Sequence, residues 1–417
     1  MRAVTPDAAV PRATLLTIAH RFGTPAYAYD LRRIKAQVRR IRSVLPERTD
    51  VLYSIKANPS LGVCQLLAAE GLGADTASVG ELMIATAAGF RSDGIMVTGP
   101  HKPRELLATA RAMPHALISV DSVDELHMMA AQRWPGRLLL RLRPDFDSGA
   151  AIYMGSSGRF GIPFDQLPEV RRCVARSSMR IAGFHVFSGS QILGGPAAAA
   201  SLRGAFELAT RAAAVLEVEA EVIGLGGGFG VPYGPGQPEL DLAPVAKELA
   251  RQRAVAPTVR LLIELGRYLT APAGYYLTTV LGTQTRQSRP AVVVDGGQHQ
   301  RPDLCGLDLA RRAYPPVPLT RSAAWRCTAT DVLGCLCLPA DVLAEAVPLP
   351  QLTAGDVLAF ANAGAYGLSA GANGFISHPV PPEIAFDGER VQLLRHRGAA
   401  RAALRDQLSL FDHRNLA

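Results

Sequence analysis

Eight short apolar or β-branched runs, separated by longer stretches of helical character, constrain the fold of this 417-residue chain more than any other feature. The runs lie near residues 51–55, 72–76, 95–98, 117–120, 137–142, 181–187, 221–225 and 259–264. The segments between them, such as VGELMIATAAGF and SVDELHMMAAQRW, are amphipathic or alanine-rich, and each is compatible with a helix. Because strands that alternate with helices are typical of a (β/α)8 barrel, we expect a TIM-like α/β barrel over residues 27–275.

The pattern changes after residue 275, where strand-like runs are separated by segments rich in proline and glycine. These runs are YYLTTVLGTQTR, PAVVVD, DVLAFA and RVQLLRHR. We therefore expect a mostly β second domain formed by residues 1–26 and 276–417. Residues 286–325 show no clear period and are expected to be rich in loops, and residues 403–417 are expected to form a tail or a peripheral helix.

Composition disfavours several classes of protein. The formal net charge is +8, but the basic residues are scattered without a run of five, and aromatic residues make up only 6%, so we expect no nucleic-acid partner. Every apolar stretch is interrupted before the ~18 residues that a membrane span needs, and the N-terminus has no continuous apolar region, so we expect a cytoplasmic protein. The six cysteines show neither a CxxC pair nor zinc-ligand spacing, and we expect no metal site.

Polar residues follow or end the predicted strands, where a barrel enzyme carries its chemistry. In chain order they are Lys56, Asp75, Ser78, His101, Lys102, Asp121, Arg143, His185, Gly226, Gly227, Gly228 and Glu264. Because the carboxyl ends of all eight strands meet at one face of a barrel, the sequence predicts a polar pocket there.

Lys56 carries the sharpest hypothesis among these residues. A lysine at the mouth of an apolar barrel is partly desolvated, its pKa falls, and the neutral amine can form a Schiff base. Of the three other lysines, Lys35 and Lys247 lie on predicted surface helices and Lys102 lies in a loop. The alternative for Lys56 is an exposed cation at a strand end.

The run GLGGGFG at 224–230 presents successive backbone N–H groups with no Cβ to block a phosphate, although flexible turns also contain such runs. Its place after the seventh strand favours phosphate binding, because barrels commonly hold a phosphate there. A Schiff-base lysine with a phosphate cradle points to pyridoxal phosphate, whose pyridine nitrogen needs an acidic partner. Glu264 can supply it, unless this carboxylate instead pairs with Arg267.

Over nearly its whole length the chain resembles the fold-type III pyridoxal phosphate decarboxylases, the group of diaminopimelate and ornithine decarboxylases. The motifs that carry the resemblance are YSIKANP, GADTASVGEL, GPHKPREL, GFHVFSGSQ, GLGGGFG, IELGRYLTAPAG, VVDGG, CLCLPADVL and GAYGLSA. They occur in order and at sensible separations along the chain.

The resemblance implies an alanine racemase-like barrel, pyridoxal 5′-phosphate as cofactor, and a homodimer with shared active sites. It implies that Lys56 holds the cofactor, and that Cys337, delivered by the neighbouring subunit, donates a proton after carbon dioxide leaves. The other implied roles are phosphate contacts from Gly226, Gly227, Gly228, Ser190 and Tyr366, pairing of Glu264 with the pyridine nitrogen, and substrate or phosphate contacts from Arg267, with Asp341 near the substrate.

Three positions depart from the family pattern. Phe187 occupies a position where relatives often carry histidine, so the ring that stacks on the cofactor is either Phe187 or His185, which share a face of one strand. Leu265 stands where the family motif has proline, and the charged residues Glu264 and Arg267 of that motif are retained. Leu338 follows Cys337 where relatives that grip a distal substrate amine carry Asp or Glu. A buried ammonium without a carboxylate partner costs several kcal/mol, so Leu338 disfavours ornithine, lysine and diaminopimelate.

The expected activity is decarboxylation of an α-amino acid, or of an amino-acyl group tethered to a carrier protein, without a distal cation. The segments GGGFGVPYGPG and GAYGLSAGANGFISHPVPPE resemble a branch of the family associated with exopolysaccharide systems and carrier-bound substrates. The alternatives are a diaminopimelate or other diamino acid decarboxylase, an amino-acid racemase, which would use a tyrosine base, and a non-catalytic relative, which would more readily have lost Lys56, Cys337 or the glycine run.

Overall fold

A computed structural model describes residues 10–153, 158–302, 313–321, 326–388, 390–405 and 407 of the chain. The described residues divide into two compact units. Unit 1 spans residues 30–274, and unit 2 combines the residues before 30 with those from 275 onward.

Unit 1 is built on a closed barrel of parallel strands, in the order β10–β11–β2–β3–β4–β5–β6–β8. The strands are β2 (Thr49–Ser54), β3 (Gly73–Thr76), β4 (Ile95–Val97), β5 (Leu117–Val120), β6 (Arg137–Leu142), β8 (Arg180–Val186), β10 (Val222–Gly227) and β11 (Arg260–Leu265). Each coincides with one of the eight apolar runs of the sequence, so the expected TIM-like barrel is confirmed.

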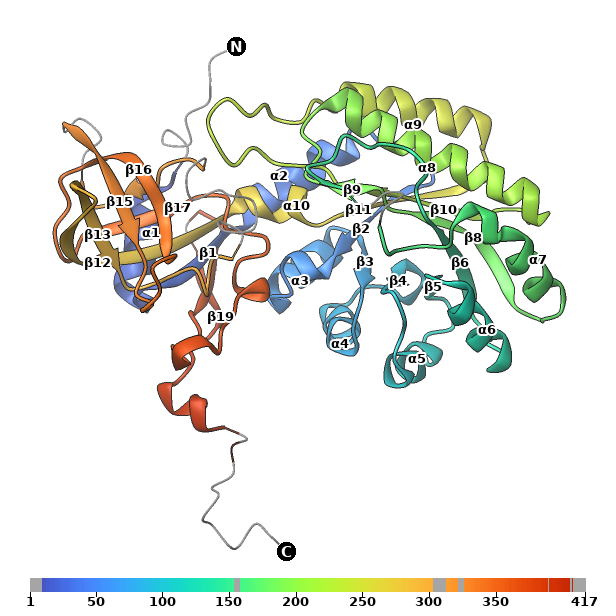
Figure 1. Cartoon of the computed structure of the whole chain (residues 1–417), viewed down its shortest axis with the longest axis horizontal. Helices are drawn as coiled ribbons and strands as arrows, with labels where there is room; N and C mark the ends of the chain where they lie inside the picture. Colours follow the sequence, from blue (N-terminus) through green and yellow to red (C-terminus); the bar gives the residue numbers. More distant parts are fainter. Residues whose placement is uncertain are drawn as a thin grey trace, which may run out of the picture. The chain divides into compact units, whose positions relative to one another are not determined.

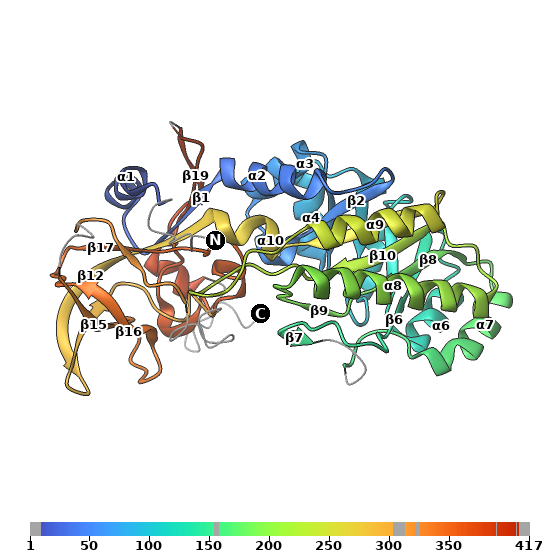
Figure 2. The same cartoon turned by 90° about the horizontal axis from the view of Figure 1, so that it is seen from above.

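Helices surround the barrel, as Figure 1 shows for α3 to α6 on one side and for α8 and α9 on another. They are α2 (Leu31–Arg42), α3 (Leu61–Ala69), α4 (Val79–Ala88), α5 (Arg104–Arg111), α6 (Val123–Ala131), α7 (Leu167–Ala175), α8 (Gly195–Leu216), α9 (Ala243–Val255) and the short α10 (Arg267–Thr270). The two long helices α8 and α9 lie side by side in both views (Figures 1 and 2). A two-stranded sheet joins β7 (Ile152–Tyr153) to β9 (Gly189–Ser190).

The same four-residue pattern, S-x-x-E, starts two helices that follow barrel strands directly in the sequence. At α4 the Ser78 hydroxyl accepts from the backbone N–H of Glu81, and the Glu81 carboxylate accepts from the N–H of Ala77. At α6, Ser122 and Glu125 repeat this arrangement, with the N–H of Asp121 as the second donor. Each box satisfies backbone donors that the first turn of a helix leaves unpaired, and so fixes where the strand-end loop stops.

Unit 2 is mostly β, as expected. Within the described residues, its nine-stranded sheet runs β16–β15–β13–β12–β1–β18–β19, with β17 pairing β12 and β14. The strands are β1 (Ala26–Asp30), β12 (Gly274–Arg286), β13 (Arg289–Val294), β14 (Val317–Pro318), β15 (Cys327–Leu333), β16 (Val342–Pro350), β17 (Val357–Phe360), β18 (Glu383–Phe386) and β19 (Val391–Arg395), and the helix α1 (Arg12–Phe22) precedes them. Leu15 and Ile18 of α1 are buried in one core with Leu277 and Phe386 of the sheet.

The hairpin of β15 and β16 was not predicted from the sequence. The first three residues of β15 are exposed, and its buried Asp331 accepts from Arg286 at 2.9 Å and from Arg289 at 2.8 Å. A strand that begins with exposed residues and buries a carboxylate lacks the apolar alternation on which sequence analysis relies. Within residues 286–325, expected to be loop-rich, PAVVVD forms β13 as its own run indicated, and 303–312 and 322–325 lie outside the described residues.

A buried ion pair anchors the carboxyl end of β5 in unit 1. The side chains of Lys102 and Glu125 are both 0% exposed, with Nζ 2.9 Å from Oε2. Lys102 also donates through Nζ to the backbone oxygen of Ser119, while the N–H of Asp121 donates to Glu125 at 2.8 Å. Burial lowers the pKa of Lys102 and outweighs the opposing effect of Glu125. The pair therefore holds the chain on either side of Val120.

Replacing Lys102 with methionine should lower the free energy of unfolding by about 3–5 kcal/mol, because it leaves the Glu125 carboxylate buried without its counter-ion. Urea denaturation followed by circular dichroism measures the change. Arg91→Ala is the control, since it breaks an exposed pair with Asp93 and should leave the urea midpoint unchanged. An equal midpoint for Lys102→Met and the wild type would contradict the assignment of Lys102 as a structural cation.

Candidate active site

The inward face of the barrel changes from apolar to polar toward the carboxyl ends of the strands. Leu52, Met96, Leu117, Leu139, Ala182, Val222 and Leu262 form one buried apolar layer across seven strands. Residues two positions apart on a strand share a face, and on five of these strands the next such residue is polar: Ser54, Thr98, Ser119, Arg141 and Glu264. On β8 and β10 it is Phe184 and Gly224. The apolar layer closes one end of the barrel, and the polar layer lines the other.

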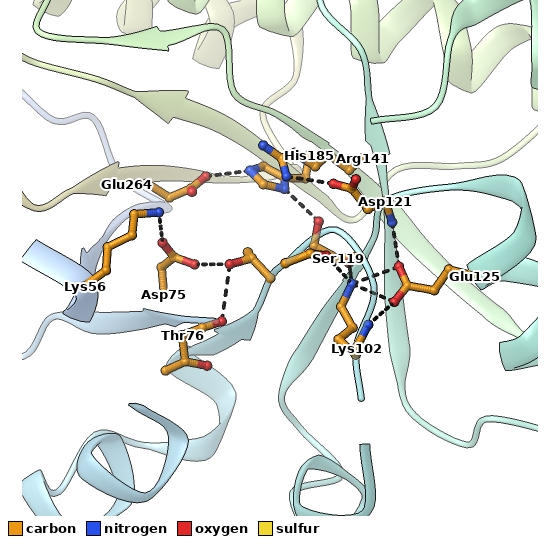
Figure 3. Close-up of polar contacts among 12 residues, drawn as sticks. Lys56, Asp75, Thr76, Lys102, Ser119, Asp121, Glu125, Arg141, His185 and Glu264 are labelled. Carbon is orange, nitrogen blue, oxygen red and sulfur yellow. Dashed lines mark hydrogen bonds and ion pairs between the residues drawn. The ribbon is translucent and has the colours of Figure 1, made fainter. Parts of the chain in front are cut away.

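Lys56 lies just beyond β2, in a short 3₁₀ helix, and its ammonium faces Asp75 of β3 at 3.4 Å (Figure 3). Burial alone would raise the pKa of Asp75, but the Lys56 cation and the Thr98 hydroxyl at 2.8 Å hold that pKa below its usual value. The Lys56 side chain is 48% exposed. Its surroundings are therefore more polar than the apolar barrel mouth that the sequence argument assumed.

His185 and Glu264 form a second, more deeply buried pair. Nε2 of His185 lies 2.9 Å from Oε1 of Glu264, and both side chains are at most 3% exposed. The two atoms are not aligned for a hydrogen bond with each other or with another side chain. Nδ1 of His185 lies 2.7 Å from the hydroxyl of Ser119 on β5 (Figure 3). Glu264 thus pairs with His185 rather than with Arg267, the partner considered from the sequence.

The predicted phosphate cradle lies beside this pair. Gly227 of β10 is in register with Glu264 of β11, and a Cβ on Gly227 would lie 2.3 Å from the backbone oxygen of Glu264. At Gly228 a Cβ would lie 1.9 Å from the oxygen of Gly189, next to Ser190. Gly226 and Gly228 have φ of +67° and +65°, in the left-handed region that favours glycine. The structure therefore brings Gly226, Gly227, Gly228 and Ser190 together.

Phe187 and Arg267 occupy two further positions of this cluster. Nζ of Lys56 lies 5.9 Å from the centroid of the Phe187 ring, which is half-buried, whereas His185 is turned toward Glu264 and Ser119. Arg267 is 8% exposed and donates to the hydroxyl of Tyr233 at 2.8 Å. The charged residues of unit 1 that were predicted for the site, Lys56, Glu264 and Arg267, thus lie at or just after the carboxyl ends of barrel strands.

The remaining predicted site residues belong to unit 2, where a loop between β15 and β16 carries Cys335 and Cys337. Asp341 is 3% exposed and accepts from the backbone N–H of Leu336 at 2.8 Å and of Gln298 at 2.7 Å, so its carboxylate holds this loop. Burial raises the pKa of Asp341 against these donors. A contact of Asp341 with substrate stays a prediction.

The two cysteines of the loop differ in accessibility. Cys335 is half-buried, with Sγ 3.8 Å from Nε2 of His378, and burial together with Asp341 raises the pKa of its thiol to about 11. Cys337 is exposed, and Leu338 after it is a large apolar side chain left 44% exposed. Tyr366 is half-buried with φ of 54°, a left-handed conformation that is rare for a tyrosine.

Ser119 and Thr98 were missed as site residues by sequence reasoning. Each lies two positions after a member of the apolar layer, Ser119 after Leu117 and Thr98 after Met96. A single polar residue at the inward phase of an apolar strand such as LISV was the available signal.

Other features of the described residues lie apart from this cluster. A surface hollow of about 660 Å³ between α6 and α7 is lined by His127, Ala130, Arg133, Glu169, Arg172, Cys173, Arg176, Ser177 and Ser178, and it shares no residue with the strand-end cluster. Across the described ranges, no group of three or more His, Cys, Asp or Glu side chains is arranged to hold a metal ion. No helix in this part of the chain combines the length and apolarity needed to cross a bilayer.

Residues 31–271 match the family described as pyridoxal-dependent decarboxylase, pyridoxal binding domain. The chain belongs to this family. It is 32% identical to the L-glutamyl-[BtrI acyl-carrier protein] decarboxylase of Niallia circulans, over 95% of this chain and 96% of that protein. It is 36% identical to a diaminopimelate decarboxylase of Actinosynnema pretiosum subsp. auranticum, over 84% and 81% of the two chains.

A similar fold is found in the crystal structure of a mutant form of the Helicobacter pylori diaminopimelate decarboxylase complexed with L-lysine. The TM-score is 0.84 at 25% identity, with 94% of this chain and 98% of that chain covered. The family and these relatives identify pyridoxal 5′-phosphate as the cofactor and the protein as a decarboxylase.

The residues of unit 1 fit this cofactor on their own chemistry. Oε1 of Glu264 is a buried carboxylate oxygen without a hydrogen bond, which suits a protonated pyridine nitrogen. A Cβ on Gly227 or Gly228 would collide with the backbone oxygen of Glu264 or Gly189, so glycine is what lets this run pack beside Ser190, and the backbone N–H groups of such a run can bind a phosphate. Lys102 is fully enclosed and paired with Glu125, whereas Lys56 stands at the strand ends with its amine accessible.

Gly228→Ala should cost the protein its cofactor, because the added methyl group would collide with the backbone at Gly189 and force the cradle open. Gly236→Ala is a matched control, since Gly236 also has a positive φ, of +80°, but a Cβ there meets nothing within 4 Å. The strain of the left-handed backbone alone, about 1–2 kcal/mol, is common to both variants. Absorbance of bound cofactor after gel filtration measures the difference, and equal retention would argue against the cradle.

Proposed function

We propose that this enzyme decarboxylates an α-amino acid, or an amino-acyl group carried by a protein, whose side chain has no distal cation. When bound, pyridoxal phosphate supplies an electron sink that weakens the bond to the departing carboxylate. The chain supplies a binding lysine, an acidic partner for the pyridine nitrogen, a phosphate cradle and a proton donor.

In unit 1, Lys56 would hold the cofactor covalently, with Asp75 orienting its amine at 3.4 Å. Glu264 would accept a hydrogen bond from the pyridine nitrogen, and its burial beside His185 supports that role. Phe187, rather than His185, would stack on the ring, because His185 is hydrogen-bonded to Ser119 and turned toward Glu264, whereas Phe187 lies near the Lys56 amine.

The phosphate would lie against Gly226, Gly227, Gly228 and Ser190, with Arg267 beside it or beside the substrate and with Tyr366 as a further phosphate contact. The backbone amides of the glycine run favour a phosphate, and Arg267 adds positive charge to this region. We propose a homodimer in which the cysteine loop of one subunit serves the active site of the other.

Cys337 would donate the proton to the α-carbon after carbon dioxide leaves. Its exposure supports this choice over Cys335, which is half-buried and faces His378. Asp341 would act by holding the loop that presents Cys337, since both its oxygens accept from backbone N–H groups.

Cys337→Ala should slow turnover by about 10²- to 10⁴-fold, the usual contribution of a positioned general acid. The absorption spectrum of the bound cofactor should stay unchanged, because binding does not use this thiol. Carbon dioxide release and chiral analysis of the amine product in deuterated water measure rate and protonation. Cys335→Ala is the matched control and should retain near wild-type rate; the reverse pattern would show that Cys335 is the acid.

Leu338 carries the substrate part of the proposal. A large apolar side chain that its own unit leaves 44% exposed is available at the position after Cys337, and it offers no counter-charge to a substrate ammonium. One relative is named as a decarboxylase of a carrier-bound L-glutamyl group, which has no distal cation. The other relatives described above are diaminopimelate decarboxylases, so diamino acid decarboxylation is the competing function.

Carbon dioxide release from a panel of substrates tests the proposal. Free L-glutamate, L-glutamyl carrier protein, L-ornithine, L-lysine and meso-diaminopimelate should be compared, with Lys56→Ala as an inactive control. Leu338→Glu should raise kcat/KM for lysine relative to the native substrate, by about 10-fold for each ~1.4 kcal/mol recovered. Efficient turnover of any diamino acid by the wild type would refute the substrate class, and Leu338→Glu dimers with unchanged preference would mean that Leu338 only packs at an interface.

A further inference from the structure

Ser119 connects the buried Lys102–Glu125 ion pair of unit 1 to the His185–Glu264 pair. It is 1% exposed, and its hydroxyl lies 2.7 Å from Nδ1 of His185, whose opposite nitrogen lies 2.9 Å from Glu264 (Figure 3). These three side chains come from β5, β8 and β11 and are arranged in one line of contacts. None of the roles proposed above involves Ser119.

The backbone of Ser119 is held more firmly than an ordinary strand end. Its carbonyl oxygen accepts from Nζ of Lys102, and two residues later the N–H of Asp121 donates to Glu125, the partner of Lys102. Asp121 in turn accepts from Arg141 at 2.7 Å. Because Lys102 and Glu125 are fully buried and paired, the Ser119 hydroxyl is presented to His185 from a fixed position.

The contact with Ser119 decides which nitrogen of His185 carries the proton. A neutral imidazole has one N–H, and its location follows from the partners of the two nitrogens. Nε2 lies 2.9 Å from Oε1 of Glu264, and an unprotonated nitrogen there would turn its lone pair toward a carboxylate oxygen, so this contact favours the hydrogen on Nε2 although the two atoms are not aligned for a hydrogen bond. Nδ1 is then the acceptor, and the Ser119 hydroxyl is the group that donates to it.

We propose that Ser119 is a positioning residue that keeps His185 in the tautomer protonated on Nε2, and thereby keeps Glu264 oriented toward the pyridine nitrogen of the cofactor. The inference rests on the proposed role of Glu264. It assigns to Ser119 no contact with substrate or cofactor; Ser119 acts through His185.

The test compares Ser119→Ala with Ser119→Thr, which keeps the hydroxyl, and with Thr76→Val as the matched control. Thr76 is a fully buried residue of β3, which β4 separates from β5, and its hydroxyl donates to the oxygen of Met96 and not to His185 or Glu264. For each variant, purified with its cofactor, the visible absorption of the cofactor is titrated with pH, and the dissociation constant of the cofactor, Tm, kcat and KM are measured.

Removing the hydroxyl leaves Nδ1 buried without a donor, so the Nε2–H no longer faces Glu264 in every molecule. Glu264 then loses a neighbour that holds it in one orientation toward the pyridine nitrogen. We expect the pH titration of the cofactor's visible absorption in Ser119→Ala to differ from that of the wild type by about 0.5 to 1 pH unit. Cofactor affinity should fall and kcat should change more than KM, while Ser119→Thr and Thr76→Val should titrate like the wild type.

The outcomes separate this proposal from the one on which it rests. Glu264→Gln is included for that purpose. If Glu264→Gln alters the cofactor spectrum and Ser119→Ala does not, the role of Ser119 is wrong and that of Glu264 stands. If Glu264→Gln leaves spectrum and titration unchanged, both roles fail. If Ser119→Thr and Thr76→Val shift the titration as much as Ser119→Ala, the effect is general loosening of the barrel, which also overturns the proposal.

Discussion

The change of the barrel interior from apolar to polar, within two residues along five of the strands, is the constraint on which the site of unit 1 depends. Parallel closure brings every strand to the same end, so one layer of side chains such as Leu52, Met96 and Leu262 packs the interior while the following layer faces the opening. Charged groups can be buried there because each lies beside a partner: Asp75 beside Lys56, and Glu264 beside His185. An unpaired member of this layer would cost several kcal/mol.

Most of the barrel and part of the site follow from the sequence because they depend on local patterns. The eight apolar runs predicted the strands, and Lys56, His185 and Glu264 stood out as charged or titratable residues at strand ends. The partners of these residues did not follow. That Glu264 meets His185 rather than Arg267 depends on the register of strands far apart in sequence, which no local pattern encodes.

Unit 2 contains strands that local sequence patterns did not predict. β12 and β13 were readable because they contain apolar runs, but β15 and β16 contain exposed positions and a buried Asp331 that is neutralised by two arginines of another hairpin. Likewise, the sequence predicts Asp341 as a site residue, whereas its carboxylate accepts from the backbone of the cysteine loop at Leu336 and from that of Gln298 in the segment after β13. A residue beside a functional cysteine can be there to fold the loop.

The two S-x-x-E boxes begin alike, but their glutamates meet different requirements. Glu81 caps α4 and lies within electrostatic reach of Lys56 and Asp75, whereas Glu125 is at once the cap of α6 and the directly bound counter-ion of the buried Lys102. Aspartate is too short to reach both partners, glutamine keeps the reach but gives up the charge, and lysine reverses it. Glutamate is therefore the residue that meets both requirements at position 125, although this position lies at an ordinary helix start and takes no part in the chemistry. A local folding signal and a long-range electrostatic requirement have been merged in a single side chain.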